Sequence, residues 1–171
     1  APYRVDMFNA LAERLDLRVV FMRKNVSYQK YDQERLLAAC RFDFDFMTRG
    51  LDFGIHMIRF GVARQIRNFK PQVVASPEYG VITQALGLRR RLGAPWGLAI
   101  FTEDNATICA EDGRLRSMLR RRALKSADRL FVYSQAARRA IAEQGLMPAD
   151  AVTVSPNIQD EASLRRRLRE A

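Results

Sequence analysis

The segment SADRLFVYSQAARRAIAEQG, residues 126–145, contains the structural unit from which the rest of the fold can be predicted. Its apolar run at 129–133 predicts a short buried strand, and the apolar spacing at 135–144 predicts an amphipathic helix. Between them lies Ser134, whose hydroxyl can cap backbone N–H groups at the helix start, or those groups can face an anion. Gly145 follows as a C-terminal cap. The segment therefore predicts a strand that runs directly into a capped helix.

The same alternation of helices and strands extends in both directions along the chain. Strands are expected at 17–22, 41–47, 73–76, 96–101 and 151–155, and helices at 3–15, 56–69, 81–92 and 114–126, with a weak helix near 34–40 and an arginine-rich helix at the C-terminus. Continuous apolar strands that alternate with helices predict an α/β fold, with a mostly parallel sheet and helices on both faces. Ligands of such sheets bind beyond the carboxyl ends of the strands.

Aromatic and acidic side chains alternate strictly in RFDFDFM, residues 41–47. Phe42, Phe44 and Phe46 would share one face of an extended strand. Asp43 and Asp45 would share the other. The pattern predicts a half-buried strand near the edge of a sheet.

The first predicted helix precedes every predicted strand. APYR, residues 1–4, is typical of a loop that follows a strand, yet these residues provide no such strand. An unpaired apolar sheet edge is unfavourable. We therefore expect that the first strand of the sheet is missing from the 171 residues, and that a longer chain or a second copy supplies it.

The composition restricts the classes of protein. With 171 residues and 48% hydrophobic content, the chain is typical of one globular domain. No apolar run is long enough to cross a membrane, and we expect a cytoplasmic protein. The formal net charge is +10, and 25 of the 29 basic residues are arginine. Such a charge favours partners that carry phosphate: nucleic acid, nucleotides or anionic lipid headgroups.

Several kinds of chemistry lack their sequence signatures. Cys40 and Cys109 are far apart and His56 is the only histidine, so no metal site is predicted and both cysteines are expected as reduced thiols. The chain contains no G-x-x-x-x-G-K-[ST] segment, no G-x-G-x-x-G segment and no nucleophile elbow. The sequence therefore gives no direct support for a nucleoside triphosphatase, a dinucleotide-binding enzyme or a serine hydrolase.

Five segments form an ordered series of motifs: APYRVDMFNALAERLDLRVVF (1–21), FKPQVVASPEYG (69–80), GAPWGLAIFTEDN (93–105), LKSADRLFVYSQAARRAIAEQGL (124–146) and VTVSPNIQD (152–160). In this order they resemble the motifs of the N-terminal domain of group 1, or family 4, retaining glycosyltransferases. Gln72 departs from the aspartate that usually follows the Lys-Pro pair of the second motif. The similarity covers nearly the whole chain.

The resemblance implies a GT-B architecture, in which two Rossmann-like three-layer domains face a cleft. Residues 1–157 would form the acceptor-side domain, and residues 158–171 the start of the interdomain linker. Such an enzyme transfers a sugar from a nucleotide-sugar to a saccharide or lipid-linked acceptor, here in bacterial polysaccharide or glycolipid synthesis. It needs no metal or cofactor, and its second domain holds most of the nucleotide-sugar. The resemblance therefore implies that the chain alone is inactive.

Within this framework the strand ends provide the candidate site. Glu103 is the residue expected to act in catalysis, by orienting an acceptor hydroxyl or its proton, while Asp104 and Asn105 bind the acceptor. Glu78 and Tyr79 follow the preceding strand and are expected to recognise sugar, with Tyr79 as a stacking surface. The alternative is a cluster of loop and helix-capping carboxylates without a ligand.

Four further residues are candidates for substrate binding. Arg4 can pair with a phosphate or an acidic acceptor, and Tyr3 would shape the same loop. Ser134 and Arg138 flank another strand end. The alternatives are a solvated arginine at a helix start, a tyrosine packed against a strand, and simple capping by Ser134.

The segment RLRSMLRRRALK, residues 114–125, predicts a basic helix. Its candidates for contact with an anionic membrane are Arg116, Arg120, Arg121 and Lys125. Such contact would place the protein peripherally on the inner face of the plasma membrane. The alternative is an ordinary surface helix whose leucines and methionine pack on the sheet.

Two other functions stay open on the sequence. One is a basic, non-enzymatic module that binds nucleic acid or an anionic membrane, and the other is a GT-B enzyme such as a nucleotide-sugar epimerase. Nucleic acid is disfavoured, because the arginine clusters at 114–125 and 165–169 contain no aromatic side chains for stacking on bases.

Overall fold

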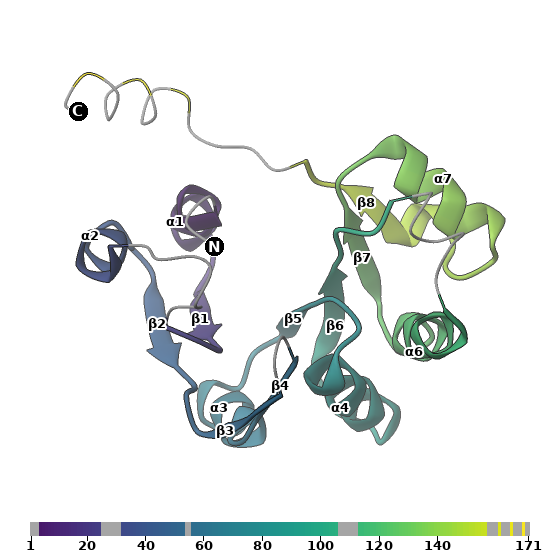
Figure 1. The fold of residues 1–171 in the computed structure, drawn as a ribbon, viewed down its shortest axis with the longest axis horizontal. Coiled ribbons are helices and arrows are strands. Elements are labelled where there is room, and N and C mark those ends of the chain that lie inside the picture. The colour runs from purple at the N-terminus through teal and green to yellow at the C-terminus, as the bar shows by residue number, and fades with distance from the viewer. Residues whose placement is uncertain are drawn as a thin grey trace. The chain divides into compact units, whose positions relative to one another are not determined.

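The computed structural model describes residues 4–24, 32–53, 56–105 and 113–156, together with Glu161, Arg165 and Arg169. The chain divides into two compact units. One comprises Ala1–Leu51, Arg59–Gly61 and Asn157–Ala171; the other comprises Asp52–Ile58 and Val62–Pro156. Each unit is described by itself (Figure 1).

The described elements alternate between helix and strand along most of the chain. In order they are α1 (Val5–Ala12), β1 (Arg18–Phe21), α2 (Gln33–Ala38), β2 (Asp43–Phe46), β3 (Gly50–Phe53), β4 (His56–Arg59), α3 (Val62–Phe69), β5 (Val73–Pro77), α4 (Val81–Arg91), β6 (Gly97–Phe101), α6 (Arg114–Leu124), β7 (Arg129–Val132), α7 (Gln135–Glu143), the short 3-10 helix η2 (Ala149–Ala151) and β8 (Val152–Val154). The predicted α/β, Rossmann-like class with a mostly parallel sheet is confirmed.

The second unit is built on a four-stranded parallel sheet in the order β5-β6-β7-β8. The crossovers all progress in one direction along the sheet, and because such connections share one hand, they place α4, α6 and α7 against the same face, as Figure 1 shows. The middle of that face is apolar, since Leu98, Ile100, Leu130 and Val132 have no exposed surface. On β5 the buried Ser76 is hydrogen-bonded to Thr83 of α4 (2.7 Å). The core of this unit therefore lies between the sheet and the three helices.

The loops that follow three of these strands lie next to one another. The Glu78 amide donates to the Phe101 carbonyl (2.7 Å), and the Thr102 amide donates to the Phe131 carbonyl (3.0 Å). On the far side, the Ser155 amide donates to the Val132 carbonyl (2.8 Å). The carboxyl ends of the strands therefore form one edge, as a parallel sheet requires.

The opening segment folds as its sequence predicts. Ser134 is the N-cap of α7, and its hydroxyl accepts a hydrogen bond from the Ala137 amide (3.1 Å). Gly145 takes a φ of +61°, the left-handed conformation that ends many helices. Capping by Ser134, one of the two roles considered for it, is thus confirmed.

The first unit contains the parallel pair β1–β2, with register from Arg18–Asp43 to Phe21–Phe46. The rings of Phe42, Phe44 and Phe46 contact one another along one side of β2, at centroid distances of 6.3 and 6.0 Å. Phe21 of β1 packs against all three rings. The alternating pattern of residues 41–47 was therefore a correct signal of a half-buried strand.

One predicted element is wrong. Residues 56–69 do not form a single helix, because β4 takes the first four residues and pairs with β3, which the sequence did not predict. Gly61 separates β4 from α3 with a φ of +106°, which side chains other than glycine rarely adopt. The predicted C-terminal helix falls mostly outside the described residues.

Candidate functional site

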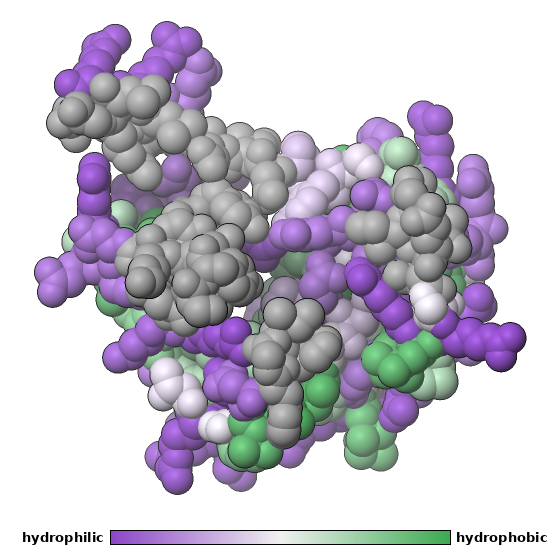
Figure 2. Space-filling model, in the orientation of Figure 1, coloured by the Kyte–Doolittle hydropathy of each residue, from purple (hydrophilic) through white to green (hydrophobic). Residues whose placement is uncertain are grey.

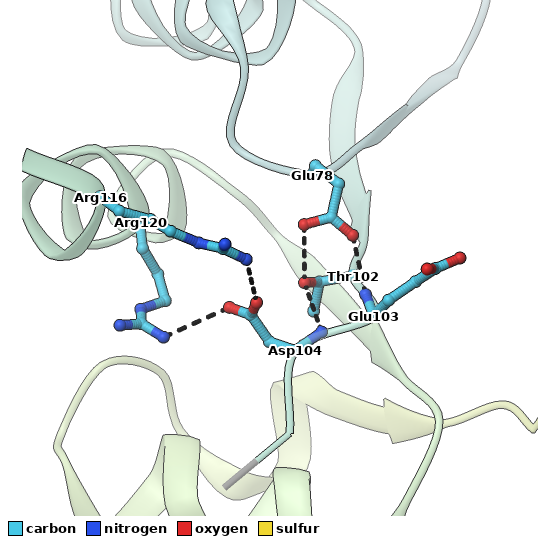
Figure 3. A network of polar contacts seen from close by, with 6 residues as sticks. All are labelled: Glu78, Thr102, Glu103, Asp104, Arg116 and Arg120. Carbon is cyan, nitrogen blue, oxygen red and sulfur yellow. Dashed lines mark hydrogen bonds and ion pairs between the residues drawn. The ribbon is translucent and has the colours of Figure 1, made fainter. Parts of the chain in front are cut away.

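A network of polar side chains lies at the carboxyl edge of the second unit's sheet (Figure 3). Thr102, Glu103 and Asp104 directly follow β6, and Glu78 directly follows β5. Parallel pairing of β5 with β6, which aligns Pro77 with Phe101, sets these two loops side by side. The sheet thereby brings the loops that carry three carboxylates and a hydroxyl together at its carboxyl edge.

Glu78 holds the loop that follows β6. One carboxylate oxygen accepts from the Glu103 backbone amide (2.8 Å), and the other accepts from the Thr102 hydroxyl (3.1 Å). Glu78 itself has a φ of +54°. This left-handed conformation costs a residue other than glycine about 1–2 kcal/mol. The strain is offset by the hydrogen bonds that it allows, and strain of this kind clusters at functional sites.

The environment of Glu78 favours its neutral form. Burial raises the pKa of Glu78, and the nearby charges of Asp104 and Glu103 add to the rise. The hydrogen bonds from the Glu103 amide and the Thr102 hydroxyl act in the opposite direction. Glu78 is therefore a carboxyl group that takes up a proton more readily than an ordinary glutamate.

Asp104 is fixed from the other side of the loop. Its carboxylate is 1% exposed and forms ion pairs with two arginines of α6, Arg116 (2.7 Å) and Arg120 (3.3 Å). Its backbone amide donates to the Thr102 hydroxyl (3.1 Å). The Arg120 side chain is itself only 2% exposed. Each buried charge thus has an opposite partner, without which burial would be costly.

Glu103 lies between these two anchors, and its side chain is exposed. Figure 3 shows its carboxylate pointing away from Glu78 and Asp104. The backbone on either side is held by Glu78 and by the Asp104 clamp, which we define as Asp104 with Arg116 and Arg120. The arrangement presents one exposed carboxylate from a fixed loop, and such a group can accept a hydrogen bond from a hydroxyl.

Comparison with protein families identifies the chain. A family described as the glycosyl transferase 4-like domain matches residues 1–157. The chain belongs to this family. A search of curated proteins finds no match.

Membership of the glycosyl transferase 4-like domain family confirms the resemblance drawn from the five motifs and makes the chain part of a transferase family. The match ends at residue 157. The boundary between a domain and a linker at this position stays a prediction.

Two residues predicted to bind substrate in this transferase-family domain are buried instead. Tyr79 is 5% exposed and belongs to the apolar core, so the prediction of a stacking surface is wrong. Its hydroxyl lies near Thr102 but makes no hydrogen bond of good geometry within the described residues, and burial raises its pKa. Asp104 is also wrong as a direct contact, because its carboxylate is enclosed by the two arginines.

The remaining predicted residues lie in several parts of the chain. Arg138, on α7, donates to the Ala149 carbonyl (3.2 Å) and so ties α7 to η2. Asn105 is exposed next to Glu103, as a contact residue would need to be. Arg4 is the N-cap of α1 in the first unit, and Tyr3 lies outside the described residues. A ligand-binding role for these four residues stays a prediction.

The candidates for membrane contact on α6 divide into two groups. Arg121 and Lys125 are exposed, as the prediction requires. The prediction of membrane contact is wrong for Arg120, because its side chain is buried against Asp104. The side chain of Arg116 is half exposed, and its guanidinium binds the same carboxylate. The helix therefore turns some of its arginines inward.

Thr102 and the Asp104 clamp were not predicted as parts of the site. Thr102 is buried, donates to Glu78 and accepts from the Asp104 amide, which makes it the link between the two anchors. Arg116 and Arg120 are four residues apart and so share one face of a helix. That spacing, downstream of an acidic strand end, is the signal that could have identified the pair.

The described residues show neither a metal-binding cluster nor a membrane-spanning helix. Among them, no group of three His, Cys, Asp or Glu side chains is arranged to hold a metal ion. Within the same residues, no helix has the length and apolar character needed to cross a membrane.

Proposed function

We propose that this domain is the acceptor-side half of a retaining glycosyltransferase, which transfers a sugar from a nucleotide-sugar to a saccharide or lipid-linked acceptor. The proposal is carried by one observation: in a member of a glycosyl transferase family, an exposed glutamate stands at the carboxyl edge of the sheet on a loop anchored from both sides. This edge is where ligands of open parallel sheets bind.

In this proposal Glu103 accepts a hydrogen bond from the acceptor hydroxyl and orients its oxygen toward the sugar. Asn105, exposed two residues later, binds a second hydroxyl of the acceptor. A second domain holds the nucleotide diphosphate, and the leaving phosphate takes the proton of the acceptor. The first domain thus positions the acceptor, a contribution that depends on the fixed geometry of its loop.

The proposal can be tested on the protein encoded by the whole reading frame that contains these residues. Release of nucleoside diphosphate is measured with a panel of nucleotide-sugars and with saccharide and lipid-linked acceptors, and the anomeric configuration of the product is determined. Glu103→Gln should lower turnover by about 10²-fold, since the amide is a weaker acceptor and carries no charge. Glu143→Gln, an exposed glutamate on α7, is the matched control and should retain full activity.

Three outcomes would contradict the proposal. Equal activity of Glu103→Gln and Glu143→Gln would remove Glu103 from the mechanism. A product of inverted configuration would exclude a retaining enzyme. Conversion of the nucleotide-sugar to an isomer without any acceptor would indicate an epimerase.

A further inference from the structure

Helices α4 and α6 of the second unit pack against each other. The Gln84 amide group donates to the Leu119 carbonyl (2.8 Å), and one turn or two further on the Arg91 guanidinium donates to the Arg122 carbonyl (3.0 Å). Gly87 of α4 faces Ser126, just after the end of α6, so closely that an added Cβ would lie 3.2 Å from the Ser126 Cβ. The two helices therefore present one continuous outer surface, which we call the α4–α6 face.

Large apolar side chains are exposed on this face. Val81, Leu88 and Leu92 are 55%, 47% and 78% exposed on α4 and its C-cap, and Leu115 and Met118 are 66% and 56% exposed on α6. The three residues of α4 and its C-cap are spaced by seven and four positions, and the two residues of α6 by three. Each set therefore lies on one side of its helix. Five of the nine exposed large hydrophobic residues within the described part of the chain are thus gathered on two helices. Figure 2 shows hydrophobic side chains in this region, bordered by hydrophilic ones.

These side chains are not core residues left partly uncovered. The inner sides of the same helices are already packed, with Leu86, Ala123 and Leu124 at most 3% exposed. The outer apolar residues belong to the opposite side, where an ordinary surface helix carries polar groups. An apolar patch bordered by polar side chains is a common mark of an interaction site.

The charged side chains of the two helices have one sign. The sequences of α4, VITQALGLRRR, and α6, RLRSMLRRRAL, contain no aspartate and no glutamate. Exposed basic residues surround the apolar ones: Arg89, Arg114, Arg121, Arg122 and Lys125. A partner of this face must therefore accept apolar side chains and carry negative charge.

We infer that the α4–α6 face docks the domain on an anionic lipid bilayer. The leucines, Val81 and Met118 enter the boundary between headgroups and acyl chains, and the arginines and Lys125 bind lipid phosphates. A nucleic acid fits less well, because its surface offers no apolar layer for aliphatic side chains and this face has no aromatic residue to stack on bases.

The position of the face suits such a contact. Val81 and Leu115 stand in the first turns of their helices, and α4 begins just after the loop that carries Glu78. Docking would therefore bring the carboxyl edge of the sheet, with Glu103, toward the lipid headgroups. Delivery of a lipid-linked acceptor to this edge rests on the proposed function, whereas lipid binding itself does not.

The inference is tested by co-sedimentation of the 171-residue chain with vesicles, in the absence of any sugar donor or acceptor. Vesicles of phosphatidylcholine alone are compared with vesicles that also contain phosphatidylglycerol. The chain should bind only the anionic vesicles, and binding should weaken as salt is added. Arg121→Ala with Lys125→Ala should lower the partition coefficient by about fivefold for each charge removed.

The apolar contribution has its own variant. Leu115→Ser with Met118→Ser should lower partitioning into anionic vesicles by about tenfold or more. Leu15→Ser, at an exposed leucine of the first unit, and Arg139→Ala, at an exposed arginine of α7, are matched controls and should bind like the parent chain. Circular dichroism should give the same thermal unfolding for all variants, because every replaced side chain is exposed.

Several results would overturn the inference. Equal binding to neutral and anionic vesicles, or no loss in either double variant, would exclude this face as the lipid contact. A nucleic-acid surface would be indicated if the chain did not bind vesicles but bound single-stranded DNA, and if Arg121→Ala with Lys125→Ala weakened the binding to DNA. Dimerisation in sedimentation velocity that Leu115→Ser with Met118→Ser abolishes would indicate that a second copy covers the face.

Discussion

The two sides of α6 reverse the usual placement of polar and apolar residues. On the side toward the sheet, Arg120 is buried together with Ala123 and Leu124. On the side toward solvent, Leu115 and Met118 are more than half exposed. A helix that packed only for stability would place the arginine outside and the leucine inside.

The comparison shows that each departure has a local cause. Arg120 can be buried because Asp104, at the end of β6, is buried beside it and supplies the opposite charge. No such partner within the described residues covers Leu115 and Met118, which is why we assign them to an interaction surface. The inner side of α6 thus supports the candidate site, and the outer side is available for a partner.

Breaking the ion pair on the inner side should have the largest effect on stability. Asp104→Ala leaves the buried Arg120 without its opposite charge and should lower the free energy of unfolding by about 3–5 kcal/mol; Arg120→Ala should also destabilise the fold, although Asp104 then keeps its ion pair with the half-exposed Arg116. Urea denaturation measures the loss. The exposed neighbour offers a matched control, since Arg121→Ala should change the free energy of unfolding by less than about 0.5 kcal/mol.

A second variant separates charge from packing. Asp104→Leu with Arg120→Met removes both charges and keeps the volume, so it should recover most of the stability lost in either alanine variant. If Arg120→Ala instead proves as mild as Arg121→Ala, the two sides of α6 do not differ in the way described.

Replacing Glu78 should have an intermediate effect. Glu78→Ala leaves the Glu103 amide and the Thr102 hydroxyl without their acceptor and should cost about 1–3 kcal/mol in free energy of unfolding. Urea denaturation of this variant beside the parent chain at constant pH measures the cost. A stability equal to that of the parent chain would mean that the two hydrogen bonds accepted by Glu78 contribute nothing to stability.

The same residue has a pH signature. Because burial raises the pKa of Glu78 in the folded state, the folded protein holds this proton more tightly than the unfolded chain. The stabilisation is complete below the ordinary value of 4.5 and is lost as the pH rises through the folded pKa. The difference in unfolding free energy between the parent chain and Glu78→Gln should therefore fall with rising pH. A constant difference would contradict the assignment.

The smallest effect is expected at the surface ion pair between Arg90 and Asp128, whose side chains are 37% and 46% exposed. Hydrogen bonding to Arg90 lowers the pKa of Asp128, so its contribution is present above the ordinary value of 3.8 and lost as the pH falls. Asp128→Asn should cost less than about 1 kcal/mol at neutral pH, measured by urea denaturation. A loss as large as that of Arg120→Ala would remove the contrast between exposed and buried pairs.

Local signals made the second unit predictable. The strand at 129–133, Ser134 and Gly145 each act through their own backbone and near neighbours, so the sequence alone specifies the capped α7. The strand ends at 76–80 and 101–105 could be placed together for a related reason, because a parallel sheet aligns the carboxyl ends of its strands whatever the side chains are.

What could not be predicted depends on contacts made outside each segment. The segment HMIR, 56–59, forms β4 and pairs with β3, although its apolar spacing suits a helix equally well. Arg120 and Tyr79 were expected at surfaces, yet Asp104 draws the arginine inward and the core encloses the ring. Side-chain burial of this kind is set by tertiary contacts that periodicity does not encode.

The central claim is that the loop after β6 is held rigidly enough to present Glu103. Amide hydrogen exchange at Glu103 tests it most directly, since this amide donates to the Glu78 carboxylate although the side chain of Glu103 is exposed. We predict slow exchange in the parent chain and in Arg121→Ala, and an acceleration of at least about tenfold in Glu78→Ala, where the acceptor is removed. Rapid exchange at Glu103 in the parent chain would contradict the account.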